Sequence, residues 1–130
     1  MVRSEAYDDH PEHSLRFDER PVRLRILLNE QILAETDAGL SLREGHYPAV
    51  IYVPREHVRM DLLTRSDRRT HCPFKGDASY FDYASASPQR DEPDLTNVAW
   101  SYEDPFDQMR RLANHLAFYD DRVTLERLPE

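Results

Sequence analysis

The residues with the clearest chemical potential are a cysteine and a lysine three positions apart. Cys72 and Lys75 are the only cysteine and the only lysine in the chain of 130 residues. An ammonium group close to a thiol lowers the pKa of that thiol and raises the share of thiolate, which is the nucleophilic form. This spacing makes Cys72 and Lys75 candidate catalytic residues.

A β-turn over residues 72–75 would bring these two side chains together. The residue before a proline is pushed into an extended conformation, and Pro73 has the φ that suits the second position of a turn. Gly76 can then adopt a positive φ or allow a ligand to approach the backbone. Two other interpretations remain open: Cys72 is a buried structural cysteine, or Lys75 binds an anion without any cysteine chemistry.

Aromatic residues in the expected strands form the second candidate group. Tyrosine hydroxyls and the indole N–H need hydrogen-bond partners when they are buried, so their number predicts either a polar-lined pocket or a well-satisfied core. We expect a pocket, with Lys75 as the cation that anchors the ligand. The predicted ligand-binding residues are Tyr52, Lys75, Gly76, Trp100, Tyr102 and Tyr119.

The charge distribution favours a small anionic ligand over a polyanion. The net charge of -8 argues against duplex nucleic acid as a partner, because phosphate binding needs a basic surface. Residues 65–76 nevertheless hold Arg65, Arg68, Arg69 and Lys75 against the single carboxylate Asp67. This positive island can attract a small anion. The alternative is a protein-interaction or structural module that docks through the arginines of residues 65–69.

Other classes of site find little support in the sequence. The histidines and the single cysteine do not have the spacing of metal ligands, and three glycines are too few for a phosphate-binding loop, so we expect no metal and no cofactor. No apolar run approaches the roughly 20 residues of a membrane helix, and no hydrophobic leader opens the chain. One unpaired cysteine fits a reducing compartment, so we expect a cytoplasmic protein. The sequence predicts no oligomeric state.

The order of the elements predicts a mainly β fold. Residues 1–19 have few apolar positions and are expected to form a flexible tail before a single domain over residues 20–130. Strand patterns occupy residues 22–26, 31–35, 40–44, 49–53, 78–83 and 96–102. Turns are expected at residues 29–30 and 37–39, one helical turn at 54–58, and polar loops at 64–69 and 85–94.

One helix is expected in the C-terminal half. Asp104 can cap it and Pro105 suits its first position. The apolar residues that recur at helical spacing predict about 12 helical residues with a core-facing stripe: Phe106, Met109, Leu112, Ala113 and Leu116. A closing hairpin over residues 117–125 follows. These elements predict a compact antiparallel β domain with one helix.

The chain also resembles a known family. The resemblance covers residues 22–128 and rests on an ordered set of short motifs: Tyr52-Val53-Pro54, Val58, Thr70-x-Cys72-Pro73-Phe74-Lys75-Gly76-x-Ala78-x-Tyr80, Asn97-Val98-Ala99-Trp100-Ser101-Tyr102-x-x-Pro105 and Leu116-Ala117-Phe118-Tyr119-Asp120-x-Arg122-Val123. Together they resemble the family called domain of unknown function 427. Its members are small, mostly bacterial proteins.

The resemblance implies a compact fold similar to the β-tent of methionine sulfoxide reductase B and related zinc-binding domains. This chain lacks the paired CxxC zinc ligands of those relatives, so neither metal binding nor reductase activity carries over. The family is also labelled nucleotidyltransferase-like, but the chain has no Gly-Ser turn followed by paired aspartates. The family's motifs fall on Tyr52, Cys72, Lys75, Gly76, Trp100, Tyr102 and Tyr119 of this sequence.

Overall fold

The first hairpin follows directly from the alternation of apolar residues. In the computed structural model, which describes residues 2–84 and 95–129, strand β2 (Val22–Leu28) buries every second side chain. The chain turns at Asn29 and Glu30, whose φ values of 50° and 68° fit a two-residue hairpin turn. It then returns as β3 (Gln31–Glu44), which pairs with β2. The predicted hairpin is confirmed.

Strand β3 is longer than the sequence suggested. The turn predicted at residues 37–39 is wrong, because β3 continues through this segment to Glu44. Its first half pairs with β2, whereas its second half pairs with β1 (Leu15–Phe17) and β4 (Val50–Pro54). At Gly39 a Cβ would lie 2.8 Å from the carbonyl oxygen of Val22. Glycine therefore permits a close approach of two strands here, not a turn.

All strands of the described residues belong to one antiparallel sheet. The other strands are β5 (Leu63–Cys72), β6 (Gly76–Tyr83), β7 (Ala99–Ser101), β8 (His115–Phe118) and β9 (Thr124–Arg127). The strand order is β5-β6-β7-β8-β4-β3-β2-β9, and β1 pairs with β3 beside this path. The predicted mainly β, antiparallel fold is confirmed.

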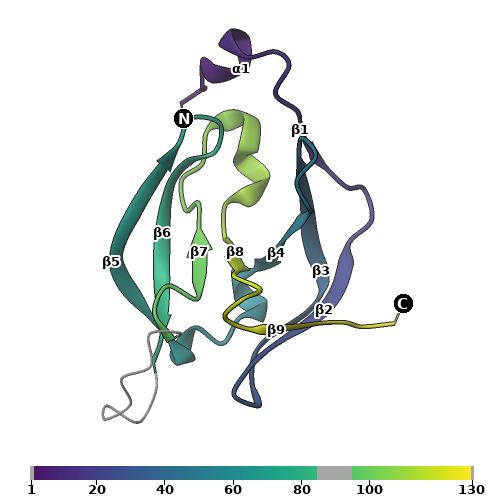
Figure 1. Ribbon diagram of the computed structural model, residues 1–130, viewed down its shortest axis with the longest axis vertical. Helices are drawn as coiled ribbons and strands as arrows, with labels where there is room; N and C mark the ends of the chain where they lie inside the picture. Colours follow the sequence, from purple (N-terminus) through teal and green to yellow (C-terminus); the bar gives the residue numbers. More distant parts are fainter. Residues whose placement is uncertain (1, 85–94, 130) are drawn as a thin grey trace.

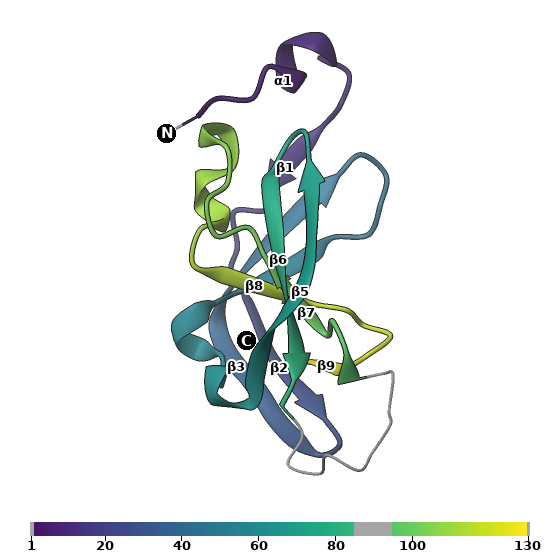
Figure 2. The same ribbon diagram turned by 90° about the vertical axis from the view of Figure 1, so that its left-hand side faces the viewer.

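The sheet is bent into two wings. Strands β5, β6 and β7 form the first wing, strands β1, β2, β3 and β9 form the second, and β4 and β8 connect them (Figure 1). Figure 2 views the β5–β6 hairpin from the side, with β2 and β3 crossing behind it at an angle. Two apolar clusters fill the space between the wings, one around Ile26 and Leu116 and the other around Tyr52 and Leu112.

The predicted C-terminal helix is wrong in type and length. Residues Asp107–Leu112 form short 3₁₀ turns (η4), which are interrupted at Met109 (φ −116°, ψ 25°). The apolar residues Phe106, Met109 and Leu112 are three positions apart, a spacing that suits 3₁₀ turns as well as an α-helix. Asn114 then adopts a φ of 61° and leads the chain into β8. The apolar stripe was correctly read as core-facing, since Met109 and Leu112 are buried.

Three other local predictions need correction. The segment 64–69 is part of strand β5, not a polar loop. The closing hairpin does not form, because β8 pairs with β4 and β7 while β9 pairs with β2. The strand predicted at residues 96–102 is shorter than expected and consists of β7 alone, because Asn97 adopts a φ of 50°.

The helical turn expected at residues 54–58 is confirmed as a 3₁₀ turn, η1 (Arg55–His57). A second 3₁₀ turn, η2 (Met60–Leu62), follows it.

The N-terminal segment has regular structure. A short helix, α1 (Ala6–Asp9), precedes strand β1 (Leu15–Phe17) within the segment that was expected to be a flexible tail. The domain boundary at residue 19 stays a prediction. The loop predicted at residues 85–94 lies outside the described residues. Within the described ranges, no helix has the length and apolar character needed to cross a membrane.

Candidate functional site

A three-residue turn, residues 73–75, connects β5 and β6, and the predicted closeness of the Cys72 thiol to the Lys75 ammonium stays a prediction. Cys72 ends β5 and pairs with Gly76, which begins β6. Gly76 adopts a φ of 120°, and a Cβ on it would lie 3.3 Å from the Cα of Pro105. The backbone N–H of Phe106 donates to the carbonyl oxygen of Lys75 over 3.0 Å. The turn is therefore packed directly against the segment that follows β7.

The charge of Lys75 is neutralised by Glu44. Its Nζ lies 2.7 Å from Glu44 Oε1 and 5.9 Å from the centre of the Tyr102 ring, and the lysine side chain is only 13% exposed. The second carboxylate oxygen of Glu44 lies 2.8 Å from His13 Nε2. Burial alone would raise the pKa of the Glu44 carboxyl group. The hydrogen bonds from Lys75 and His13 and the positive charges of these residues outweigh burial, so the pKa of Glu44 is lowered. Lys75 thus joins the first wing to the end of β3 in the second wing.

Cys72 faces the space between the wings. Its side chain is partly buried and packs against the apolar cluster that contains Tyr52 and Tyr102. This environment fits the interpretation of a structural cysteine, because apolar burial does not stabilise a thiolate. A catalytic role for Cys72 stays a prediction.

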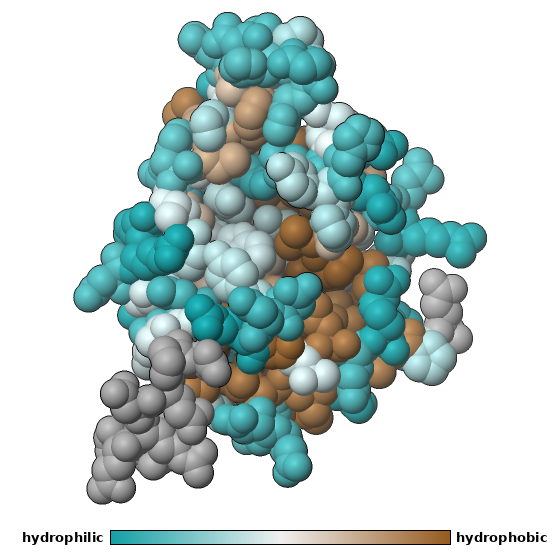
Figure 3. Space-filling model, in the orientation of Figure 1, coloured by the Kyte–Doolittle hydropathy of each residue, from teal (hydrophilic) through white to brown (hydrophobic). Residues whose placement is uncertain are grey.

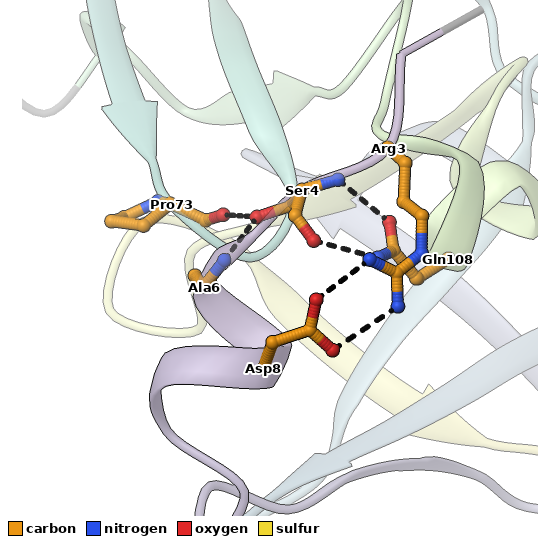
Figure 4. A network of polar contacts seen from close by, with 6 residues as sticks. All are labelled: Arg3, Ser4, Ala6, Asp8, Pro73 and Gln108. Atoms are coloured by element: carbon orange, nitrogen blue, oxygen red, sulfur yellow. Dashed lines mark hydrogen bonds and ion pairs between the residues drawn. The ribbon is translucent and has the colours of Figure 1, made fainter.

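The N-terminal segment covers the turn of residues 73–75 (Figure 4). The Ser4 hydroxyl donates to the carbonyl oxygen of Pro73, and the Tyr7 hydroxyl donates to that of Phe74 over 2.7 Å. Ser4 and Gln108 exchange two hydrogen bonds: the Ser4 N–H donates to Gln108 Oε1 at 3.0 Å, and Gln108 Nε2 donates to the Ser4 carbonyl at 2.8 Å. We call residues 2–13 the strap.

The strap also carries aromatic contacts and bridges the two wings. The His13 ring stacks on Phe74 with the ring centres 4.0 Å apart and the planes at 15°. Tyr7 meets the same Phe74 ring edge-on at 5.2 Å. The chain then continues into β1, which belongs to the second wing. Sequence reasoning missed this cover, because each contact joins residues far apart in the chain and the strap has no apolar period.

The predicted aromatic set divides into core residues and surface residues. Tyr52 and Tyr102 are 1% and 8% exposed. Burial raises the pKa of both hydroxyls, and the Trp100 indole N–H hydrogen bond to Tyr52 opposes this only in part. Trp100 and Tyr119 are half-buried, and their ring centres lie 4.4 Å apart. Of the predicted aromatic residues, Trp100 and Tyr119 are therefore the two whose side chains remain partly exposed.

The Tyr119 hydroxyl takes part in a short hydrogen-bonded chain. The Tyr80 hydroxyl lies 2.8 Å from Thr70 Oγ1, and it also interacts with the Tyr119 hydroxyl. Burial and this hydrogen bond with Tyr80 raise the pKa of Tyr119 to about 12. The contact with Tyr80 holds the Tyr119 side chain in place.

Trp100 and Tyr119 form one wall of an apolar pocket between the wings. The pocket has a volume of about 170 Å³, and its opposite wall is made of Leu24, Ile26, Ile51 and Leu125. Figure 3 shows apolar surface (brown) beside paler side chains on the face between the wings. Tyr52, Tyr102, Lys75 and Gly76 do not line this pocket. The structure thus separates the two halves of the predicted site.

Some of the arginines in β5 form ion pairs and others form none with a described residue. Arg65 and Arg55 both bind Glu103, over 2.7 Å and 3.0 Å. The hydrogen bond from Arg65 is the main reason that the pKa of Glu103 is lowered to about 2. Arg68 has no ion pair with any residue of the described ranges, and its guanidinium lies 4.9 Å from the centre of the Tyr80 ring. The positive island predicted from the sequence is therefore reduced by pairing.

A family model matches most of the chain. It is described as Domain of unknown function (DUF427), and the match covers residues 16–128. The chain belongs to this family. The resemblance inferred from the sequence motifs is confirmed, and no curated protein matches the chain.

The DUF427 match covers some features of the site and leaves one outside. Both the turn of residues 72–76 and the pocket wall of Trp100 and Tyr119 lie inside the matched residues of this DUF427 protein, whereas the strap precedes them. In the described part of the chain, no three histidine, cysteine or carboxylate side chains lie close enough together to hold a metal ion. The family description assigns no reaction to these residues.

Proposed function

We propose that this protein binds a small anionic molecule in the pocket between the wings, with the apolar part of the ligand against Trp100 and Tyr119. The observation that carries this proposal is the half-buried Trp100–Tyr119 pair on the wall of an apolar pocket. Apolar pockets with aromatic walls and few polar groups are the usual sites for small molecules.

The structure does not favour Lys75 as the cation that holds the ligand. Its ammonium group is bound by Glu44, and an anion would have to displace that carboxylate from a partly buried position. Breaking such a pair leaves an uncompensated charge, which is costly. We therefore expect an arginine to take the role that the sequence suggested for Lys75. Binding at Lys75 is the alternative that the experiment below distinguishes.

A protein-interaction module is the second candidate. Strand β5 is an edge of the sheet, and its exposed Arg68 and Arg69 have no ion pair with a described residue. An acidic partner could use this edge, although charged side chains also protect edge strands from unwanted pairing. Catalysis by Cys72 and a nucleotidyltransferase-like activity are weaker alternatives, because no arrangement of described side chains supports either.

Three finer expectations accompany this proposal. The two-winged sheet supports the similarity to a β-tent, which stays a prediction. The bacterial origin and the cytoplasmic location expected from the sequence also stay predictions.

A thermal-shift panel of nucleotides, sugar phosphates and carboxylates tests the proposal. We expect at least one anionic compound to raise the melting temperature of the wild type. The increase should persist in Lys75→Met and disappear in Tyr119→Ala. Tyr47→Ala is the matched control, since Tyr47 is 75% exposed and does not line the pocket. The proposal fails if no compound shifts the wild type, or if Lys75→Met abolishes the shift while Tyr119→Ala retains it.

A further inference from the structure

A larger groove lies beside the pocket at Trp100 and shares part of its lining. A groove of about 790 Å³ runs over the second wing. It shares four lining residues with the aromatic pocket: Leu24, Ala49, Ile51 and Leu125. Because the same side chains line both, pocket and groove form one continuous surface with an apolar floor. Leu125 is 40% exposed on this surface, and Figure 3 shows a continuous brown area in this region.

The end of the groove away from Trp100 carries free positive charge. Arg20, Arg43 and Arg127 line it, together with the carboxylates of Asp18 and Glu19. Asp18 is already engaged, since Ser41 donates to it over 2.6 Å and Arg43 Nε over 3.0 Å. Neither Arg20 nor Arg127 has an ion pair with a residue of the described ranges. This end therefore presents two free guanidinium groups against one free carboxylate, in a chain whose net charge is -8.

The volumes indicate the shape of the ligand. A pocket of about 170 Å³ is smaller than the sites that usually hold small molecules, whereas the groove of about 790 Å³ lies within their common range of roughly 300–1,000 Å³. A ligand that uses the whole surface must be elongated and apolar over the floor. It must also bear its negative charge at one end, where an arginine can bind a carboxylate with two parallel hydrogen bonds.

We infer that the ligand is a single-chain anionic amphiphile of the carboxylate class. Its aliphatic chain lies on Leu24, Ile51 and Leu125 with its tip against Trp100, and its carboxylate lies between Arg20 and Arg127. This inference rests on the proposed function, because it names the ligand class for the same pocket. Burial of the chain against the floor supplies most of the binding free energy, and the arginines select the charge.

The only tryptophan of the chain reports on this site directly, because Trp100 lines the pocket. The experiment is a fluorescence titration with decanoate, decanol and decyltrimethylammonium, each below the concentration at which it forms micelles. We expect decanoate to change the Trp100 emission at the lowest concentration. Arg127→Gln should weaken decanoate binding about tenfold, the usual effect of losing a hydrogen bond to a charged group.

Two further variants locate the ligand. Arg68→Gln removes a free arginine that does not line the groove, so decanoate should bind it as tightly as the wild type. Ala49→Leu narrows the junction of pocket and groove, so it should weaken decanoate while benzoate binding beside Trp100 persists. Thermal unfolding of each variant confirms that it is folded.

The inference is overturned if decanoate binds no better than decanol, if Arg127→Gln has no effect, or if Arg68→Gln weakens binding instead. Its failure can be told apart from failure of the proposed function. If benzoate changes the Trp100 emission and decanoate does not, only the elongated ligand is wrong. If neither anion changes it, the carboxylate ligand class is wrong, and the thermal-shift panel of nucleotides and sugar phosphates decides the proposed function.

Discussion

Lys75 and Glu44 form an ion pair between the two wings, with Nζ 2.7 Å from Oε1. The residues are 31 positions apart in the chain. The lysine that the sequence singles out as a ligand anchor is thereby part of the structure that holds the turn of residues 72–76 against the end of β3. This relationship moves the candidate binding site away from the turn and toward Trp100.

Replacing Lys75 by methionine should lower the free energy of unfolding by about 1–2 kcal/mol. The loss is larger than for a surface pair because the lysine side chain is 13% exposed and its removal leaves Glu44 partly buried beside His13. Urea denaturation at pH 7 measures the change. The control is Arg59→Met, which breaks an exposed pair with Asp61 and should cost less than about 0.5 kcal/mol. Equal losses in the two variants would contradict a structural role for Lys75.

Glu103 should make stability depend on pH in the acid range. Its pKa is lowered from 4.5 to about 2, chiefly by the hydrogen bond from Arg65. A carboxylate whose pKa is lower in the folded state stabilises the fold above the unfolded pKa, and this stabilisation is lost as the pH falls from about 4.5 toward 2. Because the side chain is 36% exposed, solvent reduces the contribution to about 1–2 kcal/mol.

The matching measurement compares the wild type with Glu103→Gln by urea denaturation at pH 7 and at pH 2.5. The wild type should be more stable at pH 7, and the difference between the two proteins should shrink at pH 2.5. A difference that is the same at both pH values would show that Glu103 does not carry this pH dependence.

Gly76 should tolerate substitution far less than Gly45. Alanine at residue 76 would have to adopt a φ of 120° with its Cβ 3.3 Å from the Cα of Pro105. We expect Gly76→Ala to destabilise the protein by about 2–3 kcal/mol, since both the conformation and the contact are unfavourable. At Gly45 the φ is 55° and no atom lies within 4 Å of the added Cβ, so Gly45→Ala should cost only about 1 kcal/mol. Thermal unfolding of both variants tests the order, and a reversed order would refute it.

The strap should protect Cys72 from reagents in solution. Ser4 and Tyr7 of the strap donate hydrogen bonds to the carbonyl oxygens of Pro73 and Phe74, the two residues that follow Cys72. Tyr7→Ala removes the hydroxyl donor to Phe74 and the ring contact with it. We therefore expect iodoacetamide to label Cys72 several-fold faster in this variant, because local opening of the strap becomes easier.

Asp9→Ala is the control for the strap, because Asp9 lies in the same short helix and is exposed. It should react at the wild-type rate. Labelling that is equally fast in the wild type and in Tyr7→Ala would mean that the strap does not cover Cys72. The chain has a single cysteine, so mass spectrometry of the intact protein is sufficient.

Local patterns predicted the strands well but not their partners. The alternation of residues 22–26 and the positive-φ turn at Asn29 and Glu30 depend on near neighbours, and the first hairpin formed as expected. The partner of β9 depends on contacts that β2 offers about 100 positions earlier in the chain, so a closing hairpin looked equally good in the sequence. The 3₁₀ turns of η4 were predicted as an α-helix because the apolar stripe was followed through Leu116, which in the structure belongs to β8.

Contacts between distant parts of the chain also limited what the sequence could show about the candidate site. The sequence singled out Trp100 and Tyr119 as candidate ligand-binding residues, which stays a prediction, and the structure brings their rings together. It could not show that Tyr52 is buried beneath them, nor that Glu44 takes up the charge of Lys75. Both facts depend on the bend between the wings, which no local pattern encodes.

The most direct test of a ligand site at Trp100 is nuclear magnetic resonance of the ¹⁵N-labelled protein during titration with an anionic ligand from the panel above. The single indole N–H resonance belongs to Trp100 and, with the backbone amides of Ile51 and Tyr119, reports on the pocket. We predict that these resonances shift at the lowest ligand concentrations and reach saturation together, while the amide resonances of Lys75 and Gly76 do not shift. Shifts centred on Lys75 and Gly76, with an unchanged indole resonance, would contradict the account.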